Sequence, residues 1–234
     1  MNILVIIPAF NEEENIGKLI RKIQEIKYKN NVDIVIINDQ STDETSPICK
    51  KMDVDILDLP CNLGIGGAVQ TGYKYAALHN YDIAIQVDGD GQHNPEYIEN
   101  LIGPIIQGKS DMVIGSRYIE HLGFQSTGVR RMGIWYLKNL INILTGLKIT
   151  DPTSGYRACN KEIIQIFASN YPKDYPEPES IMFIKRKGLK ISEVPVIMNE
   201  REGGESSINF NRSIYYMIKV SLAIVFDKIR KESF

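Results

Sequence analysis

The chain of 234 residues has a hydrophobic fraction of 43%, a charged fraction of 24% and a formal net charge of −2 at pH 7. These values are typical of a globular protein that buries a substantial core, and they exclude disordered and fibrous classes. Cys49, Cys61 and Cys159 lie far apart with no CxxC pair, which argues against a disulfide framework and a thiolate zinc site. We therefore expect a reduced, cytosolic setting.

The first 150 residues predict alternating strands and helices. The N-terminal run "NILVIIP" has no basic region and no cleavage site, so we interpret it as a strand and not as a signal peptide. A helix is predicted over 11–26 with Asn11 as its cap. Apolar runs predict strands at 2–8, 32–39, 54–59, 82–88 and 111–116, and helical patterns lie near 43–51, 67–79, 95–107 and 130–145. This alternation favours an α/β fold with a mainly parallel sheet and helices on both faces.

Beyond residue 150 the pattern is weaker. Only a helix over 180–188 and a strand over 190–197 are predicted before a last helix over 212–231. The apolar core of that helix, Ile214 to Phe226, is interrupted by Lys219. It would be about 20 Å long, against roughly 30 Å of bilayer hydrocarbon. We therefore expect that it does not span a membrane.

The C-terminal part of the chain is basic. Residues 185–234 hold 10 Lys and Arg against 6 Asp and Glu, whereas residues 1–184 hold 17 against 23. A basic end is consistent with contact to phosphates or anionic lipid, and equally with a solvated surface. The last helix has four open interpretations: it docks on the rest of the protein, pairs with a second copy, lies in the lipid interface, or meets a small membrane protein.

Polar segments follow each of the five predicted N-terminal strands, namely "PAFNEEE", "NDQSTDET", "PCNLGIGG", "DGDGQH" and "GSRY". Because parallel strands end at the same edge of a sheet, and ligands bind there, we expect these segments to form one rim. Asp88 and Asp90 are separated by Gly89, and the flexible backbone lets both carboxylates approach one point. Such a pair suits Mg²⁺ or Mn²⁺ when substrate phosphates complete the shell. The alternative is an ordinary polar turn.

Other motifs are weaker. The loop "NLGIGGAVQTG" places amides where a phosphate could bind, but helix packing equally explains Gly66 and Gly67. The arginine fork suits phosphate oxygens, and four arginines are candidates, although each alone is more simply a surface ion pair: Arg117, Arg130, Arg131 and Arg201. The three histidines are too scattered for a zinc site, and no Ser-His-Asp arrangement can be assembled: His79, His93 and His121.

The segments "PAFNEEENI", "VIINDQSTDET", "NLGIGGAVQTG", "VDGDGQHNPEYI", "VIGSRY", "DPTSGYRA" and "EREGGESS" occur in this order. In type, order and spacing the chain resembles a family 2 glycosyltransferase of the Rossmann-like GT-A fold. The resemblance is to the branch with dolichol-phosphate mannose synthases and bacterial polyprenyl-phosphate sugar transferases, and it covers roughly residues 1–210. It implies a GT-A domain over 1–205. Many relatives also carry one or more C-terminal transmembrane helices, whereas for this chain we expect only the short amphipathic, apolar helix within 206–234.

The resemblance also implies the site residues. Nucleotide-sugar binding would involve Pro8, Phe10 in place of the usual tyrosine, Glu12, Asp39, Asn62, Asp88, Gly89, Gln92 and Arg117. The metal ligands would be Asp88, Asp90 and Gln92, with Asp90 the direct one, and Arg131 and Arg201 would hold an acceptor phosphate. The catalytic candidates are Asp90, Arg117 and Asp151. Ser207 departs from the family pattern, because relatives often carry a lysine there.

The implied activity is metal-dependent, inverting transfer of a hexose-type sugar from a UDP- or GDP-sugar to polyprenyl (undecaprenyl) phosphate for cell-envelope glycan synthesis. We expect a cytoplasmic protein, peripheral at the inner membrane face, with no nucleic-acid partner. A sugar hydroxyl is the alternative acceptor, and it would need a general base. Asp151, Glu177 and Glu179 are the candidates for that base, or they order the rim loops. A sugar-nucleotide-binding module or a nucleotidyltransferase is the alternative of another class.

Overall fold

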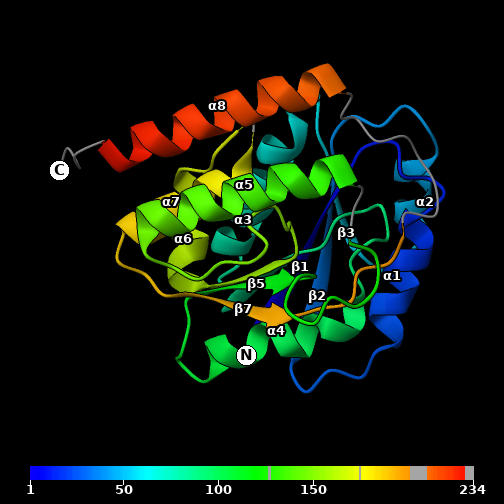
Figure 1. Cartoon of the computed structure of the whole chain (residues 1–234). Coiled ribbons are helices and arrows are strands. Elements are labelled where there is room, and N and C mark those ends of the chain that lie inside the picture. Colours follow the sequence, from blue (N-terminus) through cyan, green and yellow to red (C-terminus); the bar gives the residue numbers. More distant parts are fainter. Residues whose placement is uncertain (126–127, 174, 201–209, 230–234) are drawn as a thin grey trace.

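The computed structural model describes residues 1–125, 128–173, 175–200 and 210–229. Its centre is a seven-stranded sheet in the order β3-β2-β1-β4-β6-β5-β7, with helices on both sides (Figure 1). The strands are β1 (Asn2–Ala9), β2 (Asn31–Asn38), β3 (Asp55–Asp58), β4 (Ile83–Gln86), β5 (Met112–Ser116), β6 (Arg157–Asn160) and β7 (Ile191–Pro195). Only β6 runs against its neighbours, β4 and β5. The prediction of a mainly parallel sheet is confirmed.

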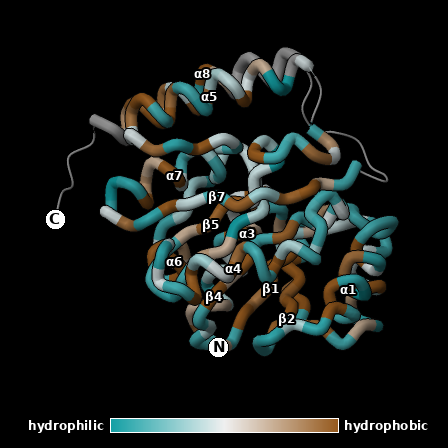
Figure 2. Tube along the Cα trace, turned by 60° about the horizontal axis from the view of Figure 1, so that its bottom comes forward, coloured by the Kyte–Doolittle hydropathy of each residue, from teal (hydrophilic) through white to brown (hydrophobic). Residues whose placement is uncertain are grey.

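The helices bury one apolar side each against the two faces of the sheet. They are α1 (Ile16–Glu25), α2 (Thr45–Lys50), α3 (Gly64–Leu78), α4 (Ile98–Ile106), α5 (Gly128–Thr145), α6 (Lys161–Ser169), α7 (Pro176–Arg186) and α8 (Phe210–Ile229), and a single 3₁₀ turn spans Pro95–Tyr97. One core cluster joins the sheet to α1 and α4, and the other joins it to α3, α5, α6, α7 and α8. Figure 2 shows the hydrophobic residues of β1 and β2 in this interior. Helices on both faces are thus confirmed.

The first helix begins later than predicted. Its apolar spacing is correct, because Ile16, Leu19, Ile20 and Ile23 are buried. Asn11, however, is not its cap: the helix begins at Ile16, and the Asn11 side chain accepts a hydrogen bond from the Thr42 backbone N–H at 2.8 Å. Asn11 instead joins the loops after β1 and β2.

The segment after residue 150 contains two elements that the sequence did not predict, β6 and α6. β6 has only four residues and no period-two pattern, so its apolar content gave no signal. α6 begins after Asn160, whose side-chain oxygen accepts from the Ile163 N–H at 3.0 Å as an N-cap. The chain just before β6 lies at the rim, because β6 is antiparallel to β4 and β5 and begins beside their ends.

The last helix lies against α5 and α7, at one edge of the molecule (Figure 1). Val220 and Ile224 are fully buried in the core that these helices share. Of the four interpretations of this helix, docking on the rest of the protein is observed for this side of α8. Within the described residues, no helix is both long and apolar enough to cross a membrane. The boundary at 205–206 lies outside the described residues.

Candidate functional site

The two aspartates after β4 lie at the edge of the sheet where β1, β2 and β5 also end. Asp90 is only 8% exposed, and its Oδ1 accepts from the Gln92 N–H at 3.1 Å. Asp88 Oδ1 accepts from Gln86 Nε2 at 3.0 Å, and its backbone N–H donates to Nδ1 of His93 at 3.0 Å. The turn is therefore held by hydrogen bonds on both sides of Gly89: the Asp88 carboxylate is bonded to Gln86 of β4, and the Asp90 carboxylate is bonded within the turn.

Two glycines permit this close approach. A Cβ on Gly89 would lie 3.1 Å from the Pro8 carbonyl oxygen and 3.4 Å from Glu12 Cγ, so the turn packs on the end of β1. A Cβ on Gly155 would lie 3.0 Å from Asp88 Oδ2, so the loop before β6 packs on the other side. The aspartates thus sit between β1 and the start of β6.

The donor set suits a hard cation that is also bound by a substrate. Carboxylate oxygens at Asp88 and Asp90 match the preferences of Mg²⁺ and Mn²⁺, and the side-chain amide oxygen of Gln92, two residues after Asp90, would be the third ligand. Among the described residues no cluster of three or more His, Cys, Asp or Glu side chains could enclose a metal. The residues therefore fit a metal that substrate oxygens complete, and they do not form an all-protein cage.

The predicted nucleotide-binding residues come together at the ends of β1 and β2. Asp39 is 4% exposed, its N–H donates to the Ala9 carbonyl at 2.9 Å, and its Oδ1 accepts from the Leu63 N–H at 2.7 Å. Asn62 Nδ2 donates to the Asp39 carbonyl at 3.1 Å. Phe10, directly after the last residue of β1, is half exposed. This arrangement leaves the half-exposed Phe10 ring at the end of β1, while the side chains of Asp39 and Asn62 are held by hydrogen bonds.

Two glycines of α3, Gly66 and Gly72, serve packing. A Cβ on Gly66 would lie 2.1 Å from the Lys173 carbonyl oxygen, and one on Gly72 would lie 2.2 Å from Ile6 Cγ2. Both positions therefore require glycine for contact with a neighbouring loop or strand. The packing interpretation of Gly66 accounts for it without a phosphate.

Arg117, directly after β5, forms a nearly buried ion pair with Asp151. Its Nε lies 2.6 Å from Asp151 Oδ2, with the two side chains 12% and 0% exposed. Burial acts to lower the pKa of Arg117, but the Asp151 carboxylate outweighs it and raises that pKa. Asp88 acts in the same direction, which places the guanidinium within electrostatic reach of the aspartate turn.

A second carboxylate holds this pair in place. Glu193 on β7 accepts from the N–H groups of Thr150 and Asp151 at 2.7 and 2.8 Å. Burial is the main cause that raises the pKa of Glu193. The Asp151 carboxylate also accepts from Thr153 Oγ1 at 3.1 Å. Asp151 is thus a fully buried partner of Arg117, and its role as a general base stays a prediction that this burial does not favour.

The other predicted cations are placed only in part. Arg130 and Arg131 are exposed in the first turn of α5. Burial raises the pKa of Tyr118, while Arg117, Arg131 and Arg130 lower it, so all three cations lie near this tyrosine. Arg201 and Ser207 lie outside the described residues. The histidines are separate: His79 stacks on Tyr75, His93 on Tyr156, and His121 lies in an exposed loop.

Comparison with known proteins identifies the family. The family model described as "Glycosyl transferase family 2" matches residues 4–167 of the chain. The chain belongs to this glycosyltransferase family. It is 32% identical to the UDP-N-acetylglucosamine–dolichyl-phosphate N-acetylglucosaminyltransferase of Methanococcus voltae, over 83% of this chain and 84% of the relative. It is 29% identical to the undecaprenyl-phosphate mannosyltransferase of Micrococcus luteus, over 89% and 88%.

A solved structure supports the fold of this glycosyltransferase. Glucosyl-3-phosphoglycerate synthase of Mycobacterium tuberculosis, crystallised with Mn²⁺ and UDP, matches 99% of this chain and 81% of its own with a TM-score of 0.74. At 20% identity the match concerns the fold alone. The GT-A architecture is thereby confirmed, and the chain is a glycosyltransferase and not a nucleotidyltransferase or a non-catalytic module.

Sequence reasoning missed several polar side chains of the glycosyltransferase site. Gln86 and Arg157 are buried at 0% and 2% exposure and face each other in the β4–β6 register. His93 stacks on Tyr156 with ring centroids 4.8 Å apart, which orients its Nδ1 toward the Asp88 amide. Glu177, by contrast, is one of the candidate bases that the sequence indicates, and burial raises its pKa to about 7. The pairing of β6 with β4 would have revealed Arg157 and Gln86, but a four-residue strand leaves no detectable period.

Proposed function

We propose that this glycosyltransferase is metal-dependent and inverting, and moves a hexose-type sugar from a UDP- or GDP-sugar to polyprenyl (undecaprenyl) phosphate. Cell-envelope glycan synthesis would consume the product. The nucleotide-sugar donor is inferred from one observation: the turn of Asp88 and Asp90 and the guanidinium of Arg117 lie at the same rim, within electrostatic reach of each other. Departure of a diphosphate requires positive charge at this point.

The chain's residues divide the work along the rim. Phe10, Asp39 and Asn62 would orient the nucleoside, because they border the ends of β1 and β2. Bound Mg²⁺ or Mn²⁺, held by Asp88, Asp90 and Gln92, would supply Lewis-acid stabilisation of the diphosphate. Arg117 would donate to diphosphate oxygens as negative charge grows on the leaving group, and Asp151 would keep its guanidinium in position.

We infer a phosphate acceptor because its transfer does not require a general base in the site. A phosphate is already an anion at pH 7, whereas a hydroxyl needs a general base. Asp151 is buried in its pair with Arg117, which argues against that role. Arg130 and Arg131 are exposed at the start of α5 and offer an anion site. Relatives named for dolichyl and undecaprenyl phosphate acceptors add support.

The hydroxyl alternative keeps Glu177 and Glu179 as candidate bases. Glu177 is partly buried at the start of α7, and its pKa of about 7 is raised first by burial and also by Asp88. A carboxyl with this pKa could accept a proton near neutral pH. The choice between the acceptors is therefore experimental.

Incubation with Mn²⁺, undecaprenyl phosphate and a panel of UDP- and GDP-sugars should yield one glycolipid, detected by thin-layer chromatography and mass spectrometry. EDTA should remove the activity, and Mn²⁺ or Mg²⁺ should restore it, because the diphosphate charge would lose its cation. Transfer to a soluble sugar without any glycolipid would contradict the acceptor. Full activity in EDTA would contradict the metal.

A lipid acceptor places the enzyme at a membrane surface, and we propose that α5 and α8 face it. Ser221 Oγ on α8 donates to Tyr136 Oη on α5 at 3.2 Å, so the two helices are neighbours. Figure 2 shows hydrophobic segments along both of them at one edge of the molecule. Large apolar side chains stay exposed on these helices: Met132, Trp135, Tyr136 and Ile143, and Ile218, Leu222, Val225 and Phe226. A second copy or a small membrane protein is the alternative occupant.

The double variant Trp135→Glu/Leu222→Glu should float poorly with anionic liposomes. These side chains are 65% and 51% exposed, and burial of one such side chain in an apolar phase contributes about 1.5–3 kcal/mol. The partition coefficient should therefore fall at least about tenfold. Leu78→Glu is the matched control, because Leu78 is 77% exposed at the end of α3. Equal flotation of all forms would exclude the lipid surface, and a dimer seen by sedimentation only in the parent would identify a second copy.

A further inference from the structure

Arg157, the first residue of β6, is the largest side chain that is almost completely buried, at 2% exposure. The resemblance to the family gave it no role. A buried guanidinium is stable only when its N–H groups find acceptors, because an unpaired buried charge is expensive. The position of Arg157 beside Gln86 in the sheet register brings it close to the aspartate turn.

The guanidinium of Arg157 forms hydrogen bonds to both the loop before β6 and helix α7. Its Nε donates to the Ser154 carbonyl at 2.7 Å, and its Nη2 to the Pro152 carbonyl at 3.1 Å. Its Nη1 donates to Ser180 Oγ on α7 at 2.6 Å, and that hydroxyl donates onward to the Glu177 carbonyl at 3.0 Å. Two of three bonds therefore define the shape of the segment 152–154.

The segment 152–154 lies between two residues that contact Arg117 and Asp88. Asp151 precedes it and holds Arg117, while Gly155 follows it and packs against the carboxylate of Asp88. A shift of the segment would therefore move the Arg117 guanidinium and the Asp88 carboxylate together.

The positive charge has a separate consequence. The described residues show no ion pair between Arg157 and a carboxylate. Arg157 lowers the pKa of Glu177 and Asp88 raises it, so both charges act on this carboxyl. A cation behind the aspartates would weaken metal binding by charge alone. Charge and geometry thus predict opposite effects of Arg157 on metal affinity.

We propose that Arg157 is a positioning residue, whose fork fixes the 152–154 segment so that Asp88 and Arg117 bind one metal–diphosphate group together. The inference rests on the proposed function for its ligand, but the fixed segment is a property of this chain itself. Arginine is required because lysine cannot donate to three acceptors in a planar fork.

Arg157→Lys keeps the charge and removes the fork. The Mn²⁺ dissociation constant, measured by electron paramagnetic resonance with UDP or GDP present, should rise by about tenfold, as for other residues that orient metal ligands. Amide hydrogen exchange of residues 151–156 in the metal-free protein should become faster. Unchanged Mn²⁺ affinity together with unchanged exchange would overturn the proposal. If the parent protein binds no Mn²⁺, the proposed metal fails, and exchange alone decides the positioning role.

Two further variants separate positioning from general stability. Gly155→Ala keeps Arg157 but places a Cβ 2.9 Å from Gln86 Nε2 and 3.0 Å from Asp88 Oδ2, so it should also weaken Mn²⁺ binding, and it replaces Arg157→Lys if that variant does not fold. Ser180→Ala removes the hydroxyl that accepts from Arg157 and donates to the Glu177 carbonyl, but leaves both bonds from Arg157 to the 152–154 segment. It should lower the melting temperature while Mn²⁺ affinity stays within about twofold. Equal loss of Mn²⁺ affinity in Ser180→Ala would indicate a merely structural role. Tighter Mn²⁺ binding in Arg157→Met would show that charge outweighs positioning.

Discussion

Asp90→Asn should lower the rate of sugar transfer by about 10³-fold, the effect of removing one strong electrostatic contact to developing charge. The asparagine keeps the volume of Asp90 and an oxygen that can accept from the Gln92 N–H. The fold should therefore survive, while the anionic ligand of the proposed metal is lost. Initial rates at saturating donor and the melting temperature are the two measurements. Activity within tenfold of the parent would refute a direct metal role for Asp90.

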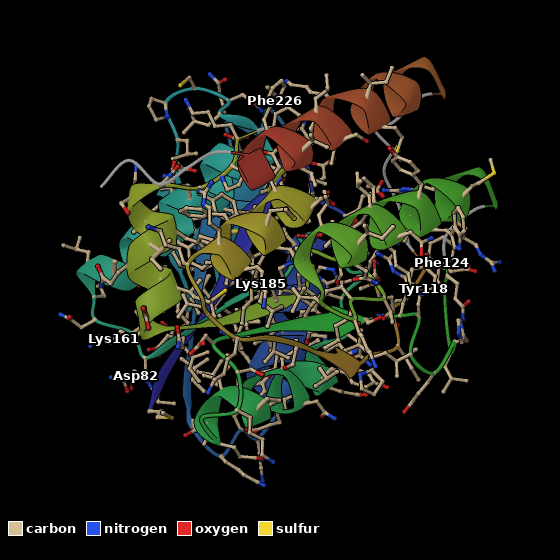
Figure 3. All side chains as sticks on the ribbon, turned by 60° about the vertical axis from the view of Figure 1, so that its left-hand side comes forward. Asp82, Tyr118, Phe124, Lys161, Lys185 and Phe226 are labelled. Atoms are coloured by element: carbon tan, nitrogen blue, oxygen red, sulfur yellow. The ribbon has the colours of Figure 1, made fainter. Side chains whose placement is uncertain are left out.

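Asp82→Asn is the matched control for this variant. Asp82 accepts one backbone N–H, from Asn2 at 2.9 Å, as Asp90 accepts one from Gln92. It lies just before β4, at the opposite end of the strand from Asp90, and Figure 3 shows it on the far side of the molecule from Tyr118. Transfer activity should be unchanged. A comparable loss in both variants would point to general loss of negative charge.

Asp151→Asn should lower the free energy of unfolding by about 3 kcal/mol, as expected when one partner of a buried pair is removed. Arg117 would then remain 12% exposed without its carboxylate at 2.6 Å. Transfer activity should also fall, because the guanidinium loses its fixed direction. Urea unfolding followed by circular dichroism gives the first quantity. A loss below about 1 kcal/mol would mean that solvent already screens the pair.

The double variant Arg117→Met/Asp151→Asn separates stability from catalysis. Replacing both members of a buried pair by neutral side chains is often close to neutral for stability. Most of the unfolding free energy should therefore return. Activity should stay low, because the cation that would contact the diphosphate is absent. Recovery of activity along with stability would contradict the catalytic role of Arg117.

Local patterns were sufficient for much of the fold. Ile3 to Ile7 and Ile34 to Ile37 are buried in parallel strands. Runs of β-branched residues predict such strands without any knowledge of the tertiary structure. β6 was missed for the opposite reason. A strand of "RACN" carries no run and no alternation, and only its pairing with β4 and β5 makes it a strand.

The sequence by itself determined the family, the α/β class and the order of polar segments along the rim, because each of the first five predicted strands is followed directly by its own polar segment. Tertiary structure decided which of those residues share partners. Asp151 meets Arg117 across 34 positions, and Gly155 packs on Asp88, only because the antiparallel β6 returns the chain to the rim. Contacts between segments so far apart depend on strand order and burial, and no local pattern encodes either one.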